Sequence, residues 1–251
     1  MTFEPLSDLN GKVVVITGAK GAIAYATAKR LAAKGATIIG LVRRDVEKAE
    51  EMYAKLPNPN GVTHKIILAD CSVTKDIENA AAQIEQCDIL VNNAGWTQTV
   101  EHSRFEMLTD DFVDKIFQNN VKGTWACIRA FTPKIKQSKI GTIVNIGSAS
   151  AKQGGGSNIM YSACKMAIES ITEHVARVLS PHVRCICIAP SLIVESDFTG
   201  LPFDVKLKRG TGLPLKRTVS SQDVAAAIEA YVMTIRFVTG SIVPVDGGRS
   251  L

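Results

Sequence analysis

The chain has 251 residues, 46% of them hydrophobic, which is enough to bury a sizeable core and is a usual length for one α/β domain. Its formal net charge of +5 is spread along the chain, and the longest basic run is only Arg43-Arg44, so nucleic-acid binding is not expected. The first residues lack a basic segment followed by an apolar run, and no stretch reaches the ~18 apolar residues of a membrane helix. These features predict a soluble, cytoplasmic protein.

The predicted elements alternate between strands and helices along the whole chain. Apolar, β-branched runs predict strands at 12–18, 36–42, 65–70, 88–95, 142–148, 183–190 and 241–248. Helical patterns follow at 22–35, 74–86, 110–131 (ended by Pro133), 161–179 and 222–234. Near-continuous apolar strands separated by helices indicate a parallel sheet that is covered on both faces. We therefore expect a single-domain, doubly wound Rossmann fold of about seven strands over residues 1–251.

Two segments lack periodicity and are expected to be functional loops. Residues 194–221 form a stretch too long for an ordinary connection, which favours a lid over the substrate. Gly154 to Gly156 predict a smaller flexible loop. The six cysteines and four histidines show neither CxxC spacing nor Cys/His clustering, so we expect reduced thiols and no metal site.

The chemistry is concentrated between Asn145 and Lys165. Lys165 follows Tyr161 by four residues in a predicted helix, so both side chains share one helix face. A cation so close is expected to lower the pKa of the phenol, which makes Tyr161 a candidate general acid and base. Ser148 ends a buried strand, at the edge where open α/β sheets build their sites, and its hydroxyl could hydrogen-bond a substrate oxygen.

This arrangement resembles the short-chain dehydrogenase/reductase superfamily, whose members carry a serine and then Tyr-x-x-x-Lys at this spacing. The motif Asn-Asn-Ala-Gly at 92–95 matches a family signature after the fourth strand, and 188–193 and 238–248 resemble two later family segments. The resemblance implies that Asn120 supports a water linked to Lys165. It also implies that Asp70 lies near the adenine ring of a dinucleotide.

The turn before the first helix, at 17–24, resembles the family's glycine turn but departs from it. Gly18 matches the first glycine, whereas Ala22 and Ala24 stand at the second and third glycine positions, with Gly21 one place early. Backbone N–H groups and the helix dipole at such a turn can hold a pyrophosphate. We expect both alanines to be tolerated because a helix start needs negative φ, and Gly21 remains available for left-handed geometry.

The end of the second strand decides which dinucleotide is expected. An acidic residue there would bind the ribose hydroxyls of NAD, whereas an arginine accommodates the 2′-phosphate of NADP. The chain has Val42, Arg43 and Arg44, with no carboxylate where NAD would need one, and Lys20 could add a second phosphate contact. The expected cofactor is therefore NADP (NADPH).

By this resemblance the protein is an NADP(H)-dependent oxidoreductase that interconverts a secondary alcohol and a ketone. The catalytic residues it implies are Asn120, Ser148, Tyr161 and Lys165. The cofactor-binding residues it implies are Gly18, Lys20, Gly21, Ile23, Arg43, Asp70, Cys71, Asn93, Ala94, Gly95, Tyr161, Lys165 and Ile193. The resemblance also implies a homotetramer or homodimer packed through the long helices that contain Asn120 and Tyr161.

Two alternative functions remain open. The segments 213–217 and 222–225 resemble those of 3-oxoacyl-thioester reductases, which would narrow the substrate within the same family. The two alanines in the glycine turn motivate a non-catalytic dinucleotide sensor, although such a protein has no chemical reason to keep the four catalytic residues. An enoyl reductase is rejected, because those relatives separate tyrosine and lysine by more residues.

Overall fold

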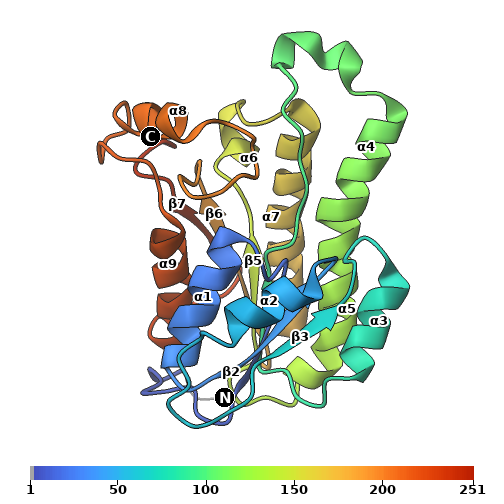
Figure 1. Cartoon of the computed structure of the whole chain (residues 1–251), viewed down its shortest axis with the longest axis vertical. Helices are drawn as coiled ribbons and strands as arrows, with labels where there is room; N and C mark the ends of the chain where they lie inside the picture. The colour runs from blue at the N-terminus through green and yellow to red at the C-terminus, as the bar shows by residue number, and fades with distance from the viewer. Residues whose placement is uncertain (1–2) are drawn as a thin grey trace.

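In the computed structural model, which describes residues 3–251, seven strands form one parallel sheet in the order β3-β2-β1-β4-β5-β6-β7 (Figure 1). The predicted fold class is confirmed. The strands are β1 Val13–Thr17, β2 Thr37–Val42, β3 Lys65–Leu68, β4 Ile89–Asn92, β5 Thr142–Ile146, β6 Arg184–Pro190 and β7 Ile242–Val245. The chain order reverses between β1 and β4, which pair in parallel, and such a switch point is where open α/β sheets bind ligands.

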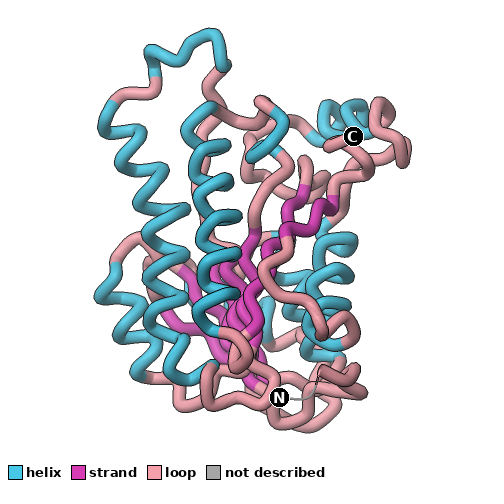
Figure 2. The backbone as a smooth tube through the Cα atoms, turned by 180° about the vertical axis from the view of Figure 1, so that it is seen from behind, coloured by secondary structure: helices cyan, strands magenta, loops and turns pink. Residues whose placement is uncertain are grey.

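Helices cover both faces of the sheet, as the apolar strands require. Along β1, Val14 and Ile16 pack into one hydrophobic cluster and Val15 into the other, because successive side chains of a strand point to opposite faces. The first cluster includes α1 Ala22–Ala33, α2 Val46–Tyr53 and α9 Ser221–Met233. The second includes α3 Thr74–Ala82, α5 Gly123–Ile135 and α7 Ile159–Leu179 (Figure 2).

The helix predicted over 110–131 is three consecutive elements. It consists of α4 Asp110–Phe117, a π-helical turn η2 Gln118–Lys122, and α5, which continues through Pro133 to Ile135. The prediction that Pro133 ends the helix is wrong. Pro133 lies in the last turn, where its missing N–H removes a single helical hydrogen bond and only two more helical residues follow. The helix predicted over 74–86 ends earlier, at Ala82.

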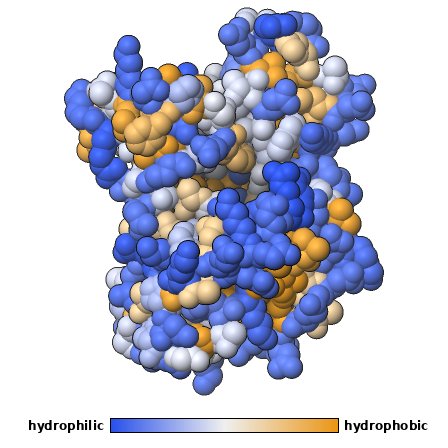
Figure 3. All heavy atoms as spheres, in the orientation of Figure 1, coloured by the Kyte–Doolittle hydropathy of each residue, from blue (hydrophilic) through white to orange (hydrophobic). Residues whose placement is uncertain are grey.

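The predicted lid region, 194–221, contains a helix that the sequence pattern did not indicate. This helix, α8 Phe203–Gly210, follows Pro202 and buries Lys206, whose ammonium donates to the carbonyl oxygens of Val194 and Ser196. Apolar side chains gather on the surface over α8 at the upper left of Figure 3, and Phe203 and Leu207 are exposed there. The lid is thus a folded segment rather than an open loop.

Three further helices were not predicted, and one of them is α2 Val46–Tyr53. Helix α6 Ser150–Gln153 directly precedes the loop predicted at Gly154 to Gly156, and it ends at Gly154 with φ of +62°. A 3-10 helix, η1 His102–Met107, precedes α4. No helix within residues 3–251 is both long and apolar enough to cross a membrane.

Candidate active site

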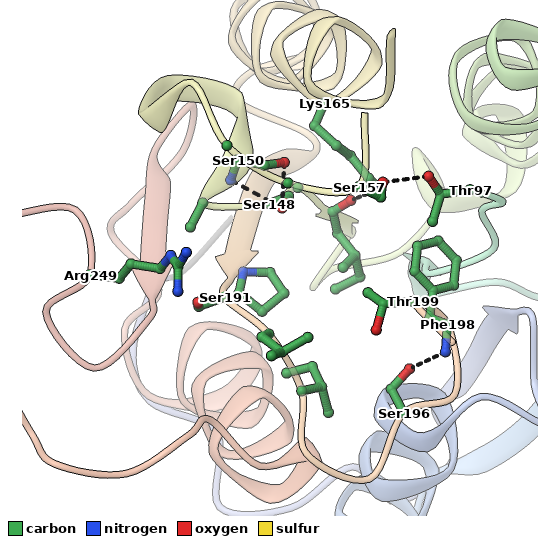
Figure 4. A pocket seen from close by; sticks show the side chains of 18 of the residues that line it. Thr97, Ser148, Ser150, Ser157, Lys165, Ser191, Ser196, Phe198, Thr199 and Arg249 are labelled. Carbon is green, nitrogen blue, oxygen red and sulfur yellow. Dashed lines mark hydrogen bonds between the residues drawn. The ribbon is translucent and has the colours of Figure 1, made fainter. Parts of the chain in front are cut away.

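The carboxyl ends of β1, β4, β5 and β6 border a cavity of about 1210 Å³ (Figure 4). Because the strands are parallel, all these ends meet at one edge of the sheet. Ser148 follows β5, while Tyr161 and Lys165 lie on the first turns of α7, and all three side chains border this cavity. The structure therefore brings together three of the four predicted catalytic residues.

Asn158 fixes the start of α7 and thereby the position of Tyr161. Its side-chain oxygen accepts from the backbone N–H of Tyr161 at 2.7 Å, as an N-cap does. Its amide nitrogen donates to Thr97 Oγ1 at 3.2 Å and to the Gln98 carbonyl at 2.8 Å, which ties the helix to the loop after β4. Sequence reasoning missed Asn158, although an asparagine three residues before Tyr161 matches the pattern of an N-cap.

The Lys165 ammonium lies beneath the catalytic cavity. It is only 5% exposed and donates to the carbonyl of Ile146 at 2.8 Å, at the end of β5. Burial disfavours the charged form and lowers the pKa of Lys165 to about 8, and the neighbouring Cys187 and Cys164 offset this lowering only in part. The ammonium nitrogen lies 5.5 Å from the centre of the Tyr161 ring.

The pKa of Tyr161 differs from the sequence-based expectation. Burial raises it above its ordinary value of 10, and the hydrogen bond with Ser148 opposes this rise only in part. The expected lowering by Lys165 is therefore wrong for this structure, because the loss of hydration of the phenolate outweighs the hydrogen bond with Ser148. Phe198, from the lid, packs beside the Tyr161 ring with the two ring centres 5.8 Å apart.

Ser150 orients the hydroxyl of Ser148. The Ser150 hydroxyl donates to Ser148 Oγ at 2.9 Å, and its backbone N–H points to the same oxygen at 3.2 Å. Two donors on this oxygen leave the Ser148 proton available for another acceptor. Figure 4 shows both serines at the same wall of the cavity. No signal in the sequence singled out Ser150.

Asn120 lies behind the cavity rather than on its wall. It is 1% exposed, in the π-helical turn, and its amide nitrogen donates to the carbonyls of Trp96 at 2.7 Å and Ile116 at 2.8 Å. Its side-chain oxygen accepts from the Trp96 N–H at 3.2 Å, and a Cβ atom on Gly95 would come within 2.8 Å of it. Asn120 therefore holds the Gly95–Trp96 segment in place, and this segment requires glycine.

The glycine turn and the Asn-Asn-Ala-Gly segment form one hydrogen-bonded unit. The hydroxyl of Thr17 accepts from the backbone N–H groups of Asn93 at 3.0 Å and Ala94 at 2.9 Å. The Asn93 side chain donates to the Thr17 carbonyl at 3.0 Å. Gly18, with φ of +65°, passes so close that an added Cβ would lie 3.1 Å from Ala94 Cα.

Ala22 and Ala24 cause no backbone strain in this turn. Ala22 is the first residue of α1 and Ala24 is fully buried in the core, and neither has positive φ. The left-handed residue of the turn is Gly18. Gly21, which was expected to be available for this geometry, has φ of −67° and is the N-cap of α1.

The cavity wall fits the nicotinamide and pyrophosphate part of a dinucleotide. It combines the start of α1, where backbone N–H groups point outward, with small residues that let a ligand approach the backbone. The predicted cofactor-binding residues on this wall are Gly18, Gly21, Ile23, Asn93, Ala94, Gly95, Tyr161, Lys165 and Ile193. Those outside it are Lys20, Arg43, Asp70 and Cys71.

Beyond the cavity, charged side chains gather after β2 and β3. Arg43 lies 3.9 Å from Asp70, and Asp45 pairs with Lys20 and lies 3.9 Å from Arg44. Asp45, which was not among the predicted site residues, places a carboxylate beside the predicted phosphate-binding residues. Both pairs are partly exposed, and such pairs are weak enough for a bound phosphate to replace the carboxylate.

Comparison with known proteins agrees with this architecture. The profile of the short chain dehydrogenase family matches residues 12–201, which is most of the chain. The chain belongs to the short-chain dehydrogenase/reductase family. It is therefore an oxidoreductase that uses a nicotinamide dinucleotide and acts on CH–OH and C=O groups.

Three short-chain dehydrogenase/reductase relatives illustrate what the match covers. A 3-oxoacyl-(acyl-carrier-protein) reductase of Aquifex aeolicus is 31% identical over 96% of this chain and 98% of its own. A short chain dehydrogenase of Burkholderia cenocepacia in complex with NADP superposes with a TM-score of 0.85 at 28% identity, over 96% and 98% of the two chains. A 3-ketoacyl-(acyl-carrier-protein) reductase of Brucella melitensis in complex with NADH superposes with a TM-score of 0.85 at 27% identity. This match covers 97% of this chain and 100% of the reductase chain.

Proposed function

We propose that this protein is an NADP(H)-dependent oxidoreductase that interconverts a secondary alcohol and a ketone, with Tyr161 as the general acid and base. The observation that carries the proposal is the convergence of Ser148, Tyr161 and Lys165 on one cavity at the switch point of the sheet. A binding-only protein would not need a phenol, a serine hydroxyl and a buried ammonium together at one site.

Each side chain has a distinct part in the proposed reaction. Ser148, held by Ser150, donates a hydrogen bond to the carbonyl oxygen of the ketone and keeps its proton. Tyr161 has a raised pKa and is protonated at neutral pH, so it transfers its proton to this oxygen as negative charge develops there. Lys165 holds the nicotinamide ribose. The bound nicotinamide supplies the hydride.

The preference for NADP(H) rests on Arg43 and Lys20. Both are cations at the end of the cleft where the 2′-phosphate of the adenosine ribose would lie, and no acidic residue follows Val42 directly. Asp45 and Asp70 satisfy these cations in the present structure. A phosphate carries more charge than one carboxylate and can displace these partners.

A 3-oxoacyl-thioester reductase is the second candidate. Two of the relatives named above carry such an activity in their names. The segment 213–217, which resembles that subgroup, places Leu213 and Pro214 on the cavity wall.

A turnover screen tests the proposal. NADPH oxidation would be followed with neutral ketones, free oxo acids and a neutral thioester, acetoacetyl-N-acetylcysteamine, and NADH would replace NADPH in a matched series. Turnover of a ketone with NADPH supports the proposal, and turnover confined to the thioester selects the second candidate. Tight NADPH binding without turnover of any compound would instead indicate a dinucleotide sensor.

We further propose that two or four copies associate through α4, α5 and α7. Phe117, Trp125 and Met166 are partly exposed on these helices, and Phe117, Trp125 and Ile171 border a shallow groove of about 620 Å³. Aromatic side chains and methionine are enriched at protein interfaces. Sedimentation analysis of the wild-type protein and of Trp125→Glu tests this, with a shift to monomer expected for the variant.

A further inference from the structure

The end of the cavity near the C-terminal segment carries hydrogen-bond donors that have no acceptor. Arg249 donates through Nε to Oε1 of Gln153 at 3.2 Å, which identifies the other atom of the Gln153 amide, Nε2, as a donor. This Nε2 is buried and has no hydrogen-bond partner among residues 3–251. Both residues border the cavity, and Figure 4 shows the Arg249 guanidinium pointing into it.

No carboxylate side chain neutralises Arg249 within the described residues. The nearest acidic residue in sequence, Asp246, is buried and accepts from the backbone N–H groups of Gly248 at 2.9 Å and Ser250 at 2.8 Å. No aspartate or glutamate lies on the cavity wall, whereas Lys165, Arg209 and Arg249 do. Among residues 3–251, Arg209 also forms no ion pair with an aspartate or glutamate.

We propose that the substrate carries an anionic oxygen group, a carboxylate or a phosphate, and that Arg249 and Gln153 bind it. This inference rests on the proposed ketone reductase function and adds the substrate class. The planar guanidinium fork matches two oxygens of such a group, and the Gln153 Nε2–H supplies a third donor. Arg209, on the lid helix α8, adds positive charge to the same cavity.

The separation between Ser148 and Gln153 relates to the length of this substrate, because one residue would contact the carbonyl and the other the anionic group. Ser148, which receives the carbonyl, stands just before α6, and Gln153 is the last residue of that single turn. One helical turn rises about 5.4 Å, so the two side chains leave the backbone about one turn apart, and a series of oxo acids of increasing length measures the spacing between carbonyl and anionic group. A neutral 3-oxoacyl thioester would leave the buried Nε2 of Gln153 without an acceptor.

The test compares matched charged and neutral ketones. Linear oxo acids from acetoacetate to 7-oxooctanoate would each be assayed beside their methyl esters, and dihydroxyacetone phosphate beside dihydroxyacetone, with NADPH. We expect kcat/KM at least tenfold higher for the best acid, or for the phosphate, than for its neutral partner. Which pair shows the preference identifies the anionic group.

Variants show whether these residues cause the preference. Arg249→Gln should lower kcat/KM of the charged substrate about tenfold and leave its neutral partner within about twofold, the scale of one charge-assisted hydrogen bond. Arg249→Lys should retain part of the preference, and Gln153→Glu, which places a carboxylate beside Arg249, should abolish it. Arg177→Gln, which removes one exposed charge from the end of α7, is the matched control and should change neither value.

The possible outcomes distinguish failure of the anionic subsite from failure of the proposed ketone reductase function. Equal turnover of charged and neutral partners, or a preference that survives Arg249→Gln, would overturn the anionic subsite and keep the ketone reductase. If no carbonyl compound is reduced, the proposed function fails, and the subsite is then tested by calorimetric titration of hexanoate into the protein with NADP. Tenfold weaker hexanoate binding by Arg249→Gln supports the subsite, and unchanged binding overturns it.

Discussion

The proposed dinucleotide site has an inner end at the catalytic cavity and an outer end at the charged residues after β2 and β3. The side chains at these two ends differ in burial and in how firmly they are held. At the inner end, Tyr161 and Lys165 are held by an N-cap, a strand carbonyl and a serine hydroxyl, and Lys165 is 5% exposed. At the outer end, the Arg43 side chain is 49% exposed and its ion-pair partner lies 3.9 Å away. Buried groups have few alternative partners, whereas exposed charges exchange partners with water and salt. Substitutions should therefore have large effects at the inner end and small ones at the outer end.

The largest effect is expected for Tyr161→Phe. This variant removes the proposed proton donor and should lower turnover at least ~100-fold while NADPH affinity changes little. Steady-state kinetics on a ketone substrate and a fluorescence titration of NADPH provide the two measurements. A variant that keeps more than about a third of wild-type turnover would remove Tyr161 from the mechanism.

Lys165→Met tests the burial of the inner end through the pH dependence of stability. The pKa of Lys165 is about 8 in the folded protein and 10.5 as the ordinary value, so between these values the unfolded chain binds more protons. The contribution of Lys165 to the free energy of unfolding should then rise as pH increases from 8 to 10.5. Urea unfolding of wild type and variant at several pH values gives this difference, and a flat or falling curve would contradict the assigned burial.

Arg43→Ala probes the outer end and should have a moderate effect. The wild type is expected to prefer NADPH to NADH, and the variant should lose most of this preference, about tenfold, because it lacks a charge-assisted contact to the 2′-phosphate. NADH affinity serves as the internal control and should stay constant. If the variant distinguishes the two dinucleotides as well as the wild type does, Arg43 is a surface residue without a part in binding.

The smallest effect is expected for Ala22→Gly and Ala24→Gly. Both alanines have ordinary helical backbone, and the close approach to Ala94 occurs at Gly18 instead. NADPH affinity should change less than about threefold in either variant. Tightening of tenfold or more would show that the natural turn is impaired, which would favour the sensor over the enzyme.

The sheet, the position of each strand along the chain and the three residues around the cavity could be predicted from the sequence because they depend on local periodicity and spacing, although strands such as β4 and β7 are shorter than predicted. Ser148, Tyr161 and Lys165 lie near the ends of regular elements, and these elements place them together in the fold. The raised pKa of Tyr161 could not be predicted, since burial arises from Phe198 and other distant residues that pack around it.

Helix α8 and the contact between Arg249 and Gln153 could not be predicted either, for physical reasons. Helix α8 has few apolar periodic positions, and its burial depends on Lys206 donating to carbonyls of the preceding segment. Arg249 lies 96 residues from Gln153 and meets it only after the chain folds. The sequence pattern therefore predicts the catalytic residues better than it predicts the residues proposed to determine substrate specificity, Gln153 and Arg249.

The π-helical turn at 118–122 has a consequence for how this enzyme tolerates insertions and deletions. A π turn contains one residue more than an α-helical turn, and each residue of an α-helix advances about 100° around the axis. Deleting a single residue there would restore regular helical geometry while α4 and α5 keep their faces, because the wider turn already absorbs the extra residue. The side chains of the turn would be re-aimed instead, so Asn120 could no longer bridge the Gly95–Trp96 segment and Ile116, and the length of this turn is constrained to the single residue.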